Sequence, residues 1–275
     1  MITKQFTGRV INQHQKALWI LCFVLMAVLC GCAAKQQTSA GTGWIDLFNG
    51  KDLDDWIIKI SGYELNDNPG NTFRVEDGIL KVSYDQFQKF DGEFGHMFYK
   101  DKFSHYILRL EYRVVGTQLT GGPEWGFRNS GIMLHSQPPE TIGKDQDFPV
   151  SVEVQLLSGD GTHDRTTANV CTPGTNVVID GDLITDHCVS SSSKTYHGEQ
   201  WVKIEAEVHG NGIIKHFVNG QLVMEYQNPQ LDETDLDAQK LLKTRDKMLS
   251  DGYIGLQAES HPLEFRKIQL LPLEE

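Results

Sequence analysis

The chain has 275 residues, enough for one large domain or two small ones with a substantial hydrophobic core. Hydrophobic residues make up 39% of the sequence and charged residues 23%, which argues against a disordered chain, a collagen or a membrane protein with many spans. The formal net charge is -12, from 25 Lys and Arg against 37 Asp and Glu. This acidity argues against nucleic acid or an anionic lipid surface as a partner.

The first 31 residues have the features of an export signal. Three basic residues and no acidic residue precede or adjoin an apolar run over residues 17–30, which is too short for a comfortable membrane span. The run ends in Leu29-Cys30-Gly31-Cys32, which resembles the bacterial lipobox. The sequence therefore predicts cleavage after residue 31 and lipidation of Cys32, with an uncleaved anchor helix as the alternative.

Either alternative places the rest of the chain outside the cytoplasm. Ala33, rather than Asp, follows the lipidated position, as in lipoproteins that are sorted onward to the outer membrane. We therefore expect a protein of the bacterial cell envelope that contacts the membrane only through its N-terminal lipid. Residues 32–43 form a short polar tether, and residues 44–275 form the exported domain. Loss of residues 1–31 would change the net charge from -12 to -15, because it removes three basic residues and no acidic one.

Two cysteines remain for the folded domain. Of the five in the chain, two leave with the signal and Cys32 carries lipid, so that Cys171 and Cys188 are left. In an oxidising compartment the sequence predicts a disulfide between them. The alternative is a metal site that includes His187, but two cysteines and one adjacent histidine do not form a recognisable ligand set.

From Trp44 onward the sequence predicts an all-β fold. Short segments rich in Val, Ile, Tyr and Phe alternate with Gly, Asn, Asp and Pro, which is typical of a β-sandwich or barrel. The strands expected most clearly span residues 106–115, 150–156, 201–208, 213–218 and 221–226. Asn219-Gly220 predicts a hairpin turn between the last two. One helical stretch is expected over residues 233–249, from a partial amphipathic stripe of leucines.

Three segments alternate apolar and polar residues, so that each strand would turn its polar side chains to one face. These segments span residues 129–135, 150–156 and 253–259, and their polar faces carry Asn129, His135, Glu153, Gln155, Gln257 and Glu259. If the strands are neighbours in one curved sheet, they would form a concave polar surface suited to a sugar. The alternative is an ordinary solvated face, which antiparallel sheets often expose.

Several motifs occur together in one order along the chain. The first is Trp44-Ile-Asp-Leu-Phe-Asn-Gly-Lys-Asp-Leu-Asp-Asp-Trp56. It is followed by Phe73-Arg-Val-Glu-Asp-Gly-Ile-Leu80, Asn129-Ser-Gly-Ile132, Glu153-Val-Gln155, Trp201, Asn219-Gly220, Gly252-Tyr-Ile-Gly-Leu-Gln257 and Glu264-Phe-Arg266. Together these motifs resemble the 3-keto-disaccharide hydrolase domain family. The resemblance implies a concanavalin A-like jelly-roll β-sandwich, here with one short helical insertion.

The resemblance also implies a reaction. Members of the family act on glycosides whose sugar ring is already oxidised at carbon 3. The ketone acidifies the hydrogen on carbon 2, so that a base can remove it and the leaving group on carbon 1 departs by β-elimination. Water can then add to the resulting enone. Such a reaction needs a base, an acid for the departing oxygen and a group that polarises the ketone.

The ionisable residues on the three polar faces are the candidates for catalysis. We expect Glu153 or His135 as the base, and Glu259 as the acid or as a metal ligand. The residues expected to bind substrate are Arg128, Asn129, Gln155, Gln257, His261 and Trp125.

Each assignment has a structural alternative. Glu153 would otherwise bond a neighbouring strand, His135 would be a structural histidine, and Arg128 would pair with Glu124. Trp125 would be either a sugar-stacking platform or a plug for its loop. The segment Glu259-Ser-His-Pro262 departs from many relatives, so either Glu259 or His261 could do the work.

The sequence identifies no cofactor. His135, Glu153 and Glu259 would form a plausible ligand set for a divalent cation, but no contiguous metal motif accompanies them. Nothing indicates a nicotinamide, because no GxGxxG motif follows a strand and opens a helix.

Two other functions stay open. A conventional glycosidase needs a second carboxylate near the first, whereas Gln155 is the next residue on the face that carries Glu153. A non-catalytic lipoprotein that binds carbohydrate would need the same aromatic and amide surface without a base.

Overall fold

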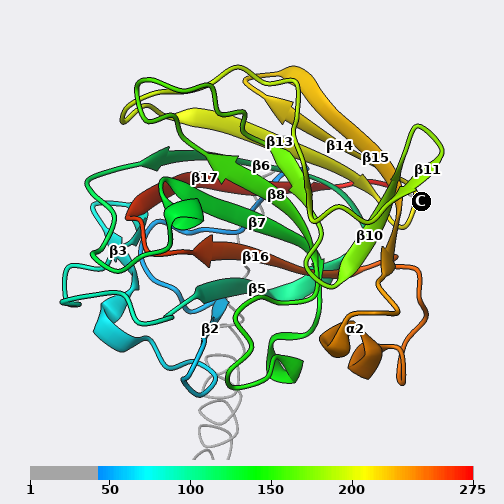
Figure 1. The fold of residues 1–275 in the computed structure, drawn as a ribbon, viewed down its shortest axis with the longest axis horizontal. Helices are drawn as coiled ribbons and strands as arrows, with labels where there is room; N and C mark the ends of the chain where they lie inside the picture. Colours follow the sequence, from blue (N-terminus) through cyan, green and yellow to red (C-terminus); the bar gives the residue numbers. More distant parts are fainter. Residues whose placement is uncertain (1–42, 275) are drawn as a thin grey trace, which may run out of the picture. The chain divides into compact units, whose positions relative to one another are not determined.

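The computed structural model describes residues 43–274, so the expected signal segment and Cys32 lie outside the described residues. Two antiparallel sheets pack face to face and form a β-sandwich (Figure 1). This arrangement confirms the all-β prediction and the sandwich architecture. Within residues 43–274, no helix has the length and apolar character that a membrane crossing requires.

One sheet has ten strands. They are β1 (Ile45–Asp46), β3 (Phe73–Glu76), β4 (Ile79–Val82), β6 (His105–Val114), β10 (Thr175–Ile179), β11 (Asp182–Ile184), β13 (Val202–His209), β14 (Ile213–Val218), β15 (Gln221–Leu231) and β17 (Leu263–Pro272). Their order across the sheet is β11-β10-β15-β14-β13-β6-β17-β4-β3, and β1 pairs with β17.

The other sheet has seven strands and carries the candidate site. They are β2 (Trp56–Ile60), β5 (Gly95–Phe103), β7 (Asn129–Ser136), β8 (Val152–Leu157), β9 (Asn169–Cys171), β12 (Cys188–Val189) and β16 (Gly252–Ala258). Their order is β12-β9-β8-β7-β16-β5-β2. The three strands whose polar faces were expected to meet, β8, β7 and β16, are therefore direct neighbours (Figure 1).

The alternation of residue types along the strands builds the core between the sheets. In β6 the side chains of Tyr106, Leu108, Leu110 and Tyr112 point inward and are each at most 1% exposed. Alternate residues of one strand lie on the same face because the side-chain period of a strand is two. Polar residues in between are thereby turned outward, and β13 repeats the pattern next to β6.

The hairpin predicted at Asn219-Gly220 is confirmed. The two residues connect β14 to β15, and their φ angles are 51° and 83°. A turn with two positive φ angles matches the twist of the flanking strands, and Asn followed by Gly adopts it at low cost.

The predicted helix exists but is shorter than expected. Short helices lie at η1 (Pro69–Asn71), η2 (Glu124–Gly126), η3 (Pro139–Thr141) and α2 (Leu236–Leu241). The Asp235 side chain caps α2 by accepting hydrogen bonds from the backbone N–H groups of Asp237 and Ala238. After α2 the chain turns back, and Met248 pairs with Gln230 of β15. This tertiary pairing ends a helix that the leucine stripe would otherwise continue.

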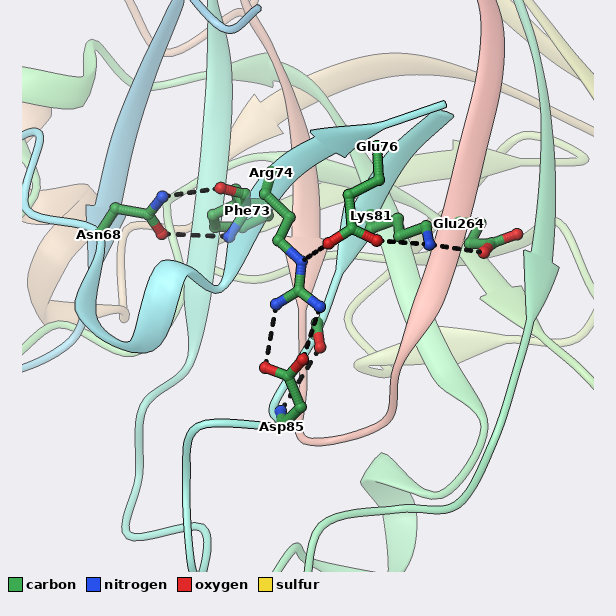
Figure 2. Close-up of polar contacts among 8 residues, drawn as sticks. Asn68, Phe73, Arg74, Glu76, Lys81, Asp85 and Glu264 are labelled. Atoms are coloured by element: carbon green, nitrogen blue, oxygen red, sulfur yellow. Dashed lines mark hydrogen bonds and ion pairs between the residues drawn. The ribbon is translucent and has the colours of Figure 1, made fainter. Parts of the chain in front are cut away.

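Charged side chains cover the edge strand β3 (Figure 2). The guanidinium of Arg74 forms two hydrogen bonds with the Asp85 carboxylate and a third with Glu76. The Asn68 side chain bonds both the N–H and the carbonyl of Phe73 and holds the start of the strand. A charged edge discourages pairing with the edge strands of other molecules.

Candidate active site

A pocket of about 300 Å³ lies on the face of the seven-stranded sheet that is turned away from the core. It is lined by Trp125, Asn129, Phe148, Glu153, Gln155, Cys171, Pro173, His187, Cys188 and Glu259. Five of these ten residues were predicted to act in catalysis or substrate binding, and they come from β7, β8, the end of β16 and η2. The pocket exists because apolar alternation commits the other face of each strand to the core.

The carboxyl group of Glu153 occupies space that Gly131 leaves free on the neighbouring strand. A Cβ atom at Gly131 would lie 2.3 Å from Oε1 of Glu153, closer than any side chain tolerates. Glu153 is 7% exposed, and burial alone raises the pKa of its carboxyl to about 8. A carboxyl with this pKa is partly ionised near neutral pH and is a stronger base than an ordinary glutamate.

Glu259 brings a second carboxyl into the same pocket. It follows the last residue of β16, is 3% exposed, and its Oε2 has no hydrogen-bond partner among the described residues. Burial, together with the charge of Glu153, raises the pKa of Glu259 well above its ordinary value. Two carboxyls that share one dry site do not ionise together, because each charge opposes the other. The pair therefore keeps at least one proton across neutral pH.

Two amides in the pocket have fixed orientations. The Nδ2 group of Asn129 donates to the carbonyl of Trp125 at 3.2 Å, while its buried Oδ1 has no partner within the described part of the chain. The Oε1 atom of Gln155 accepts from Nδ2 of Asn169 at 2.9 Å. Asn129 therefore presents an acceptor and Gln155 an N–H donor to a ligand.

The disulfide prediction is confirmed and the bond forms part of the pocket wall. Cys171 of β9 and Cys188 of β12 are bonded at 2.07 Å and lie opposite each other in the sheet. Both cysteines line the pocket, and so does the adjacent His187. The bond thereby couples the folding of the segment between the two cysteines, which are 17 positions apart, to the shape of the site.

Aromatic side chains form another part of the pocket wall. Trp125 is 50% exposed and stacks on Phe94 with ring centroids 5.5 Å apart and an interplanar angle of 15°. Phe148 packs against both rings at centroid distances of 5.1 and 6.0 Å. A half-exposed ring at the rim of a polar pocket is suited to stack on a sugar.

His135 lies outside the pocket, contrary to its expected position on the polar face. Its φ angle is 49°, and the pairing of β7 with β16 shifts register between Tyr253 and Gly255. This bulge breaks the alternation of β7. The His135 Nε2 group hydrogen-bonds the carbonyl of Gly210 at 2.8 Å, in the turn between β13 and β14 of the other sheet. The geometry supports a structural role for this histidine.

Arg128 and His261 also lie outside the pocket and support its rim. The guanidinium of Arg128 donates to Ser158 Oγ and to the carbonyl of Gly198, so it does not pair with Glu124. The backbone N–H of Arg128 donates to Nδ1 of His261 at 3.1 Å. These bonds hold the chain where it enters β7.

The expected metal ligands do not come together. Glu153 and Glu259 share the pocket, but His135 points toward the other sheet. Among residues 43–274, no three His, Cys, Asp or Glu side chains are grouped so that they could hold a metal ion. The side chains of this part of the chain therefore do not fit a protein-held divalent cation.

Three residues of this region, Phe148, Pro173 and His96, were not predicted from the sequence, and His187 was considered only as a metal ligand. Phe148, Pro173 and His187 line the pocket from loops, where no periodic pattern marks them. Gln257, predicted to bind substrate, is buried and does not line the pocket, and His96 of β5 lies opposite it in the sheet. Only the pairing of β5 with β16 brings His96 next to Gln257, and the sequence alone does not reveal this pairing.

Comparison with known proteins addresses the fold and the family. No curated protein matches the sequence. Two solved structures from Parabacteroides distasonis, both named provisionally as glycosyl hydrolases, share the fold. The first is 18% identical, with a TM-score of 0.50, and the match covers 84% of this chain and 99% of that one. The second is 16% identical, with a TM-score of 0.50, and covers 96% of this chain and 99% of that one.

The family match is more specific than the structural likeness. The model of the 3-keto-alpha-glucoside-1,2-lyase-like domain matches residues 43–271, nearly the whole described chain. This match confirms the resemblance found in the sequence motifs and supports a role in cleaving glycosides or binding carbohydrate. The chain belongs to the 3-keto-alpha-glucoside-1,2-lyase-like domain family.

Proposed function

We propose that this protein cleaves the glycosidic bond of glycosides that carry a ketone at carbon 3 of the sugar ring, and that it does so by β-elimination. The observation that carries the proposal is the pair of buried carboxyls, Glu153 and Glu259, that line one pocket and both have a raised pKa. The family of the chain supports this class of substrate, and the names of the two structures from Parabacteroides distasonis support only the cleavage of a glycosidic bond.

The pair supplies both proton transfers of an elimination. The carboxylate of Glu153 removes the hydrogen on carbon 2, and the electron pair of that bond forms the double bond between carbons 1 and 2. The bond between carbon 1 and the glycosidic oxygen breaks, and that oxygen takes the proton of Glu259. The products are the free aglycone and an unsaturated ketone, to which water can add. The ring loses one hydrogen and one leaving group, so no oxidant is consumed.

The assignment of base and acid follows from the electrostatics of the pocket. Both carboxyls are raised in pKa by burial, but the charge of Glu153 raises the pKa of Glu259 further. Glu259 is therefore the group that holds its proton and can act as the acid. Glu153, with a pKa of about 8, retains an ionised fraction at neutral pH and can act as the base.

Other pocket residues would orient the sugar. Asn129 offers an acceptor and Gln155 a donor for ring hydroxyls, both held by hydrogen bonds to the protein. Trp125 offers a half-exposed ring for stacking. Such prearranged contacts would hold the reacting carbon near the base without further reorganisation.

A second candidate function is the hydrolysis of unoxidised glycosides. Conventional glycosidases use one protonated and one ionised carboxyl on either side of the bond. The sequence of β8 alone argued against such a pair, but Glu259 supplies the second carboxyl from the end of β16. The two functions differ in substrate, since a glycosidase needs no ketone.

One experiment separates these functions. The mature chain would be incubated with a 3-keto-glucoside and, separately, with the matching unoxidised glucoside, and release of the aglycone would be followed. Elimination predicts cleavage of the keto sugar alone, and loss of that cleavage in Glu153→Gln. Glu225→Gln, which changes an exposed carboxyl on β15, is the matched control. Cleavage of the unoxidised glucoside alone would establish the glycosidase instead.

We also propose that the enzyme is a lipoprotein of the bacterial envelope, anchored through Cys32. The support is the sequence alone, with its basic start, its short apolar run and its lipobox-like end. When the full chain is expressed with Cys32→Ser, the protein should leave the membrane fraction and its mass should lack the lipid. Unchanged membrane fractionation and mass would contradict lipidation.

A further inference from the structure

A row of polar residues crosses the seven-stranded sheet beside the carboxyl pair. The registers of β8, β7, β16 and β5 place Gln155, Gly131, Gln257 and His96 side by side across the four strands. The side chains of Gln257 and His96 lie on the same face as Glu153, because their strand neighbours Leu256 and Met97 point into the core. The row therefore continues the floor of the pocket toward β5.

The inner end of this row carries polar atoms without partners. Nε2 of His96 and Oε1 of Gln257 are buried, and neither has a hydrogen-bond partner among residues 43–274. The two side chains are only 3% and 1% exposed. Buried polar atoms are nearly always paired in folded proteins, so adjacent unpaired atoms indicate a place where a ligand or water binds.

The chemistry of the unpaired atoms points to a ligand rich in donors. Oδ1 of Asn129 and Oε1 of Gln257 are both buried near the pocket without partners in the described chain. Amide oxygens can only accept hydrogen bonds, whereas a sugar ring offers several hydroxyl donors. A neutral histidine can donate from Nε2 and so bind the ketone oxygen of a keto sugar, which carries no hydrogen and can only accept.

Burial keeps His96 neutral, and the charge of the nearby Lys59 adds to the effect. The buried ammonium of Lys59 donates to the carbonyls of Ile60, Tyr63 and Lys144 at 3.0, 3.0 and 2.9 Å. Burial, and then the charge of Lys59, lower the pKa of His96 to about 3. His96 is therefore uncharged at neutral pH and serves as a hydrogen-bond partner rather than a proton source.

Phe148 contacts both the open pocket and the inner end of the row. Its ring lines the pocket on one side and packs edge-on against His96 on the other, with centroids 6.2 Å apart. Phe148 lies in the loop between η3 and β8, outside the strands that form the floor. A change in the position of this one side chain would join the pocket to the atoms beneath it.

We propose that the substrate pocket continues beneath Phe148 to His96 and Gln257, and that this inner subsite holds the oxidised side of the sugar ring. This inference rests on the elimination proposed above. His96 donates from Nε2 to the ketone oxygen, and Gln257 accepts from a ring hydroxyl. Elimination needs a donor at that oxygen because negative charge develops there when carbon 2 loses its proton. The carboxyl pair supplies the base and the acid but no such donor.

The test compares His96→Phe, which keeps a ring but removes the donor, with His135→Asn. His135 is also a buried histidine of this sheet, but it bonds Gly210 away from the pocket. With a 3-keto-glucoside as substrate, His96→Phe should have a kcat about 100-fold below that of the wild type, as expected for loss of a donor to a developing oxyanion. Gln257→Leu should raise KM about tenfold, as for loss of one buried hydrogen bond. His135→Asn should change neither constant.

Binding measurements separate this inference from the proposed function. In a Glu153→Gln background, calorimetry with the 3-keto-glucoside should show about tenfold weaker binding when His96→Phe or Gln257→Leu is added. If the wild type cleaves the keto sugar and both variants keep its kcat, KM and affinity, the inner subsite is wrong and the unpaired atoms hold only water. If the wild type cleaves no glycoside at all, the proposed function fails, while the calorimetry still decides whether sugar reaches the inner end. His96→Asn replaces His96→Phe if the latter does not fold.

Discussion

Replacement of Glu153 by Gln should make the protein more stable while it abolishes activity. Glu153 is buried, and burial alone raises the pKa of its carboxyl to about 8. The folded state therefore binds this proton more tightly than the unfolded state does. The stability that the group contributes is complete below its unfolded pKa of 4.5 and is lost as the pH rises toward 8.

The size of the effect follows from the two pKa values. At about 1.4 kcal/mol for each pH unit, ionisation of this carboxyl opposes folding by about 4 kcal/mol at pH 8 but only by about 1 kcal/mol at pH 5. Gln has no proton to lose, so Glu153→Gln removes this dependence. The free energy of unfolding gained by the variant should therefore be about 3 kcal/mol larger at pH 8 than at pH 5.

Urea unfolding of the wild type and of Glu153→Gln at both pH values measures this difference. Glu225→Gln serves as the control, because its carboxyl is exposed and should give the same small change at pH 5 and pH 8. An equal effect of Glu153→Gln at the two pH values would refute the reasoning. It would mean that Glu153 ionises in the folded protein as freely as in the unfolded chain.

Three further predictions concern the same pocket. Gly131→Ala should lower kcat/KM by about tenfold or more, because its Cβ would lie 2.3 Å from Oε1 of Glu153. Gly143→Ala is the control, since its Cβ would meet only an ordinary contact at 3.5 Å and should leave the kinetics unchanged. Equal effects of the two variants would contradict the placement of the carboxyl. Double replacement of Cys171 and Cys188 by Ser should lower the free energy of unfolding by about 3 kcal/mol, as expected for a loop of this length. It should also slow turnover, because the disulfide lines the site. A chemical-denaturation midpoint equal to that of the wild type would contradict the predicted loss of stability. The pH profile of kcat/KM should rise about tenfold for each pH unit up to about pH 8, where the base becomes ionised, and a profile that is flat between pH 5 and pH 8 would remove Glu153 from that role.

Much of the site could be predicted because period-two alternation is a local property. In β8 the apolar row of Val152, Val154 and Leu156 commits one face to the core, and this alone turns Glu153 and Gln155 to the other. The same reasoning held for Gln257 in β16. Local alternation is visible in one sequence because each strand must bury one face whatever its neighbours are.

What could not be predicted depends on contacts between strands. The bulge at His135 arises from the register of β7 against β16, which leaves no mark in the sequence of β7. Strand β5 is buried on both faces from Gly95 to Tyr99, so its residues show no alternation that would single out His96. The meeting of Glu259 with Glu153 likewise requires that the end of β16 lie beside the strands that carry the pocket.

The choice between substrates tests the central claim most directly. The mature enzyme would be given a 3-keto-glucoside and the matching unoxidised glucoside at equal concentration, while aglycone release and the ultraviolet absorbance of the unsaturated ketone are followed together. Elimination by the carboxyl pair predicts that only the keto sugar is cleaved, with the absorbance appearing alongside the aglycone and both signals lost in Glu153→Gln. Cleavage of the unoxidised glucoside at an equal or greater rate, or no cleavage of the keto sugar, would contradict it.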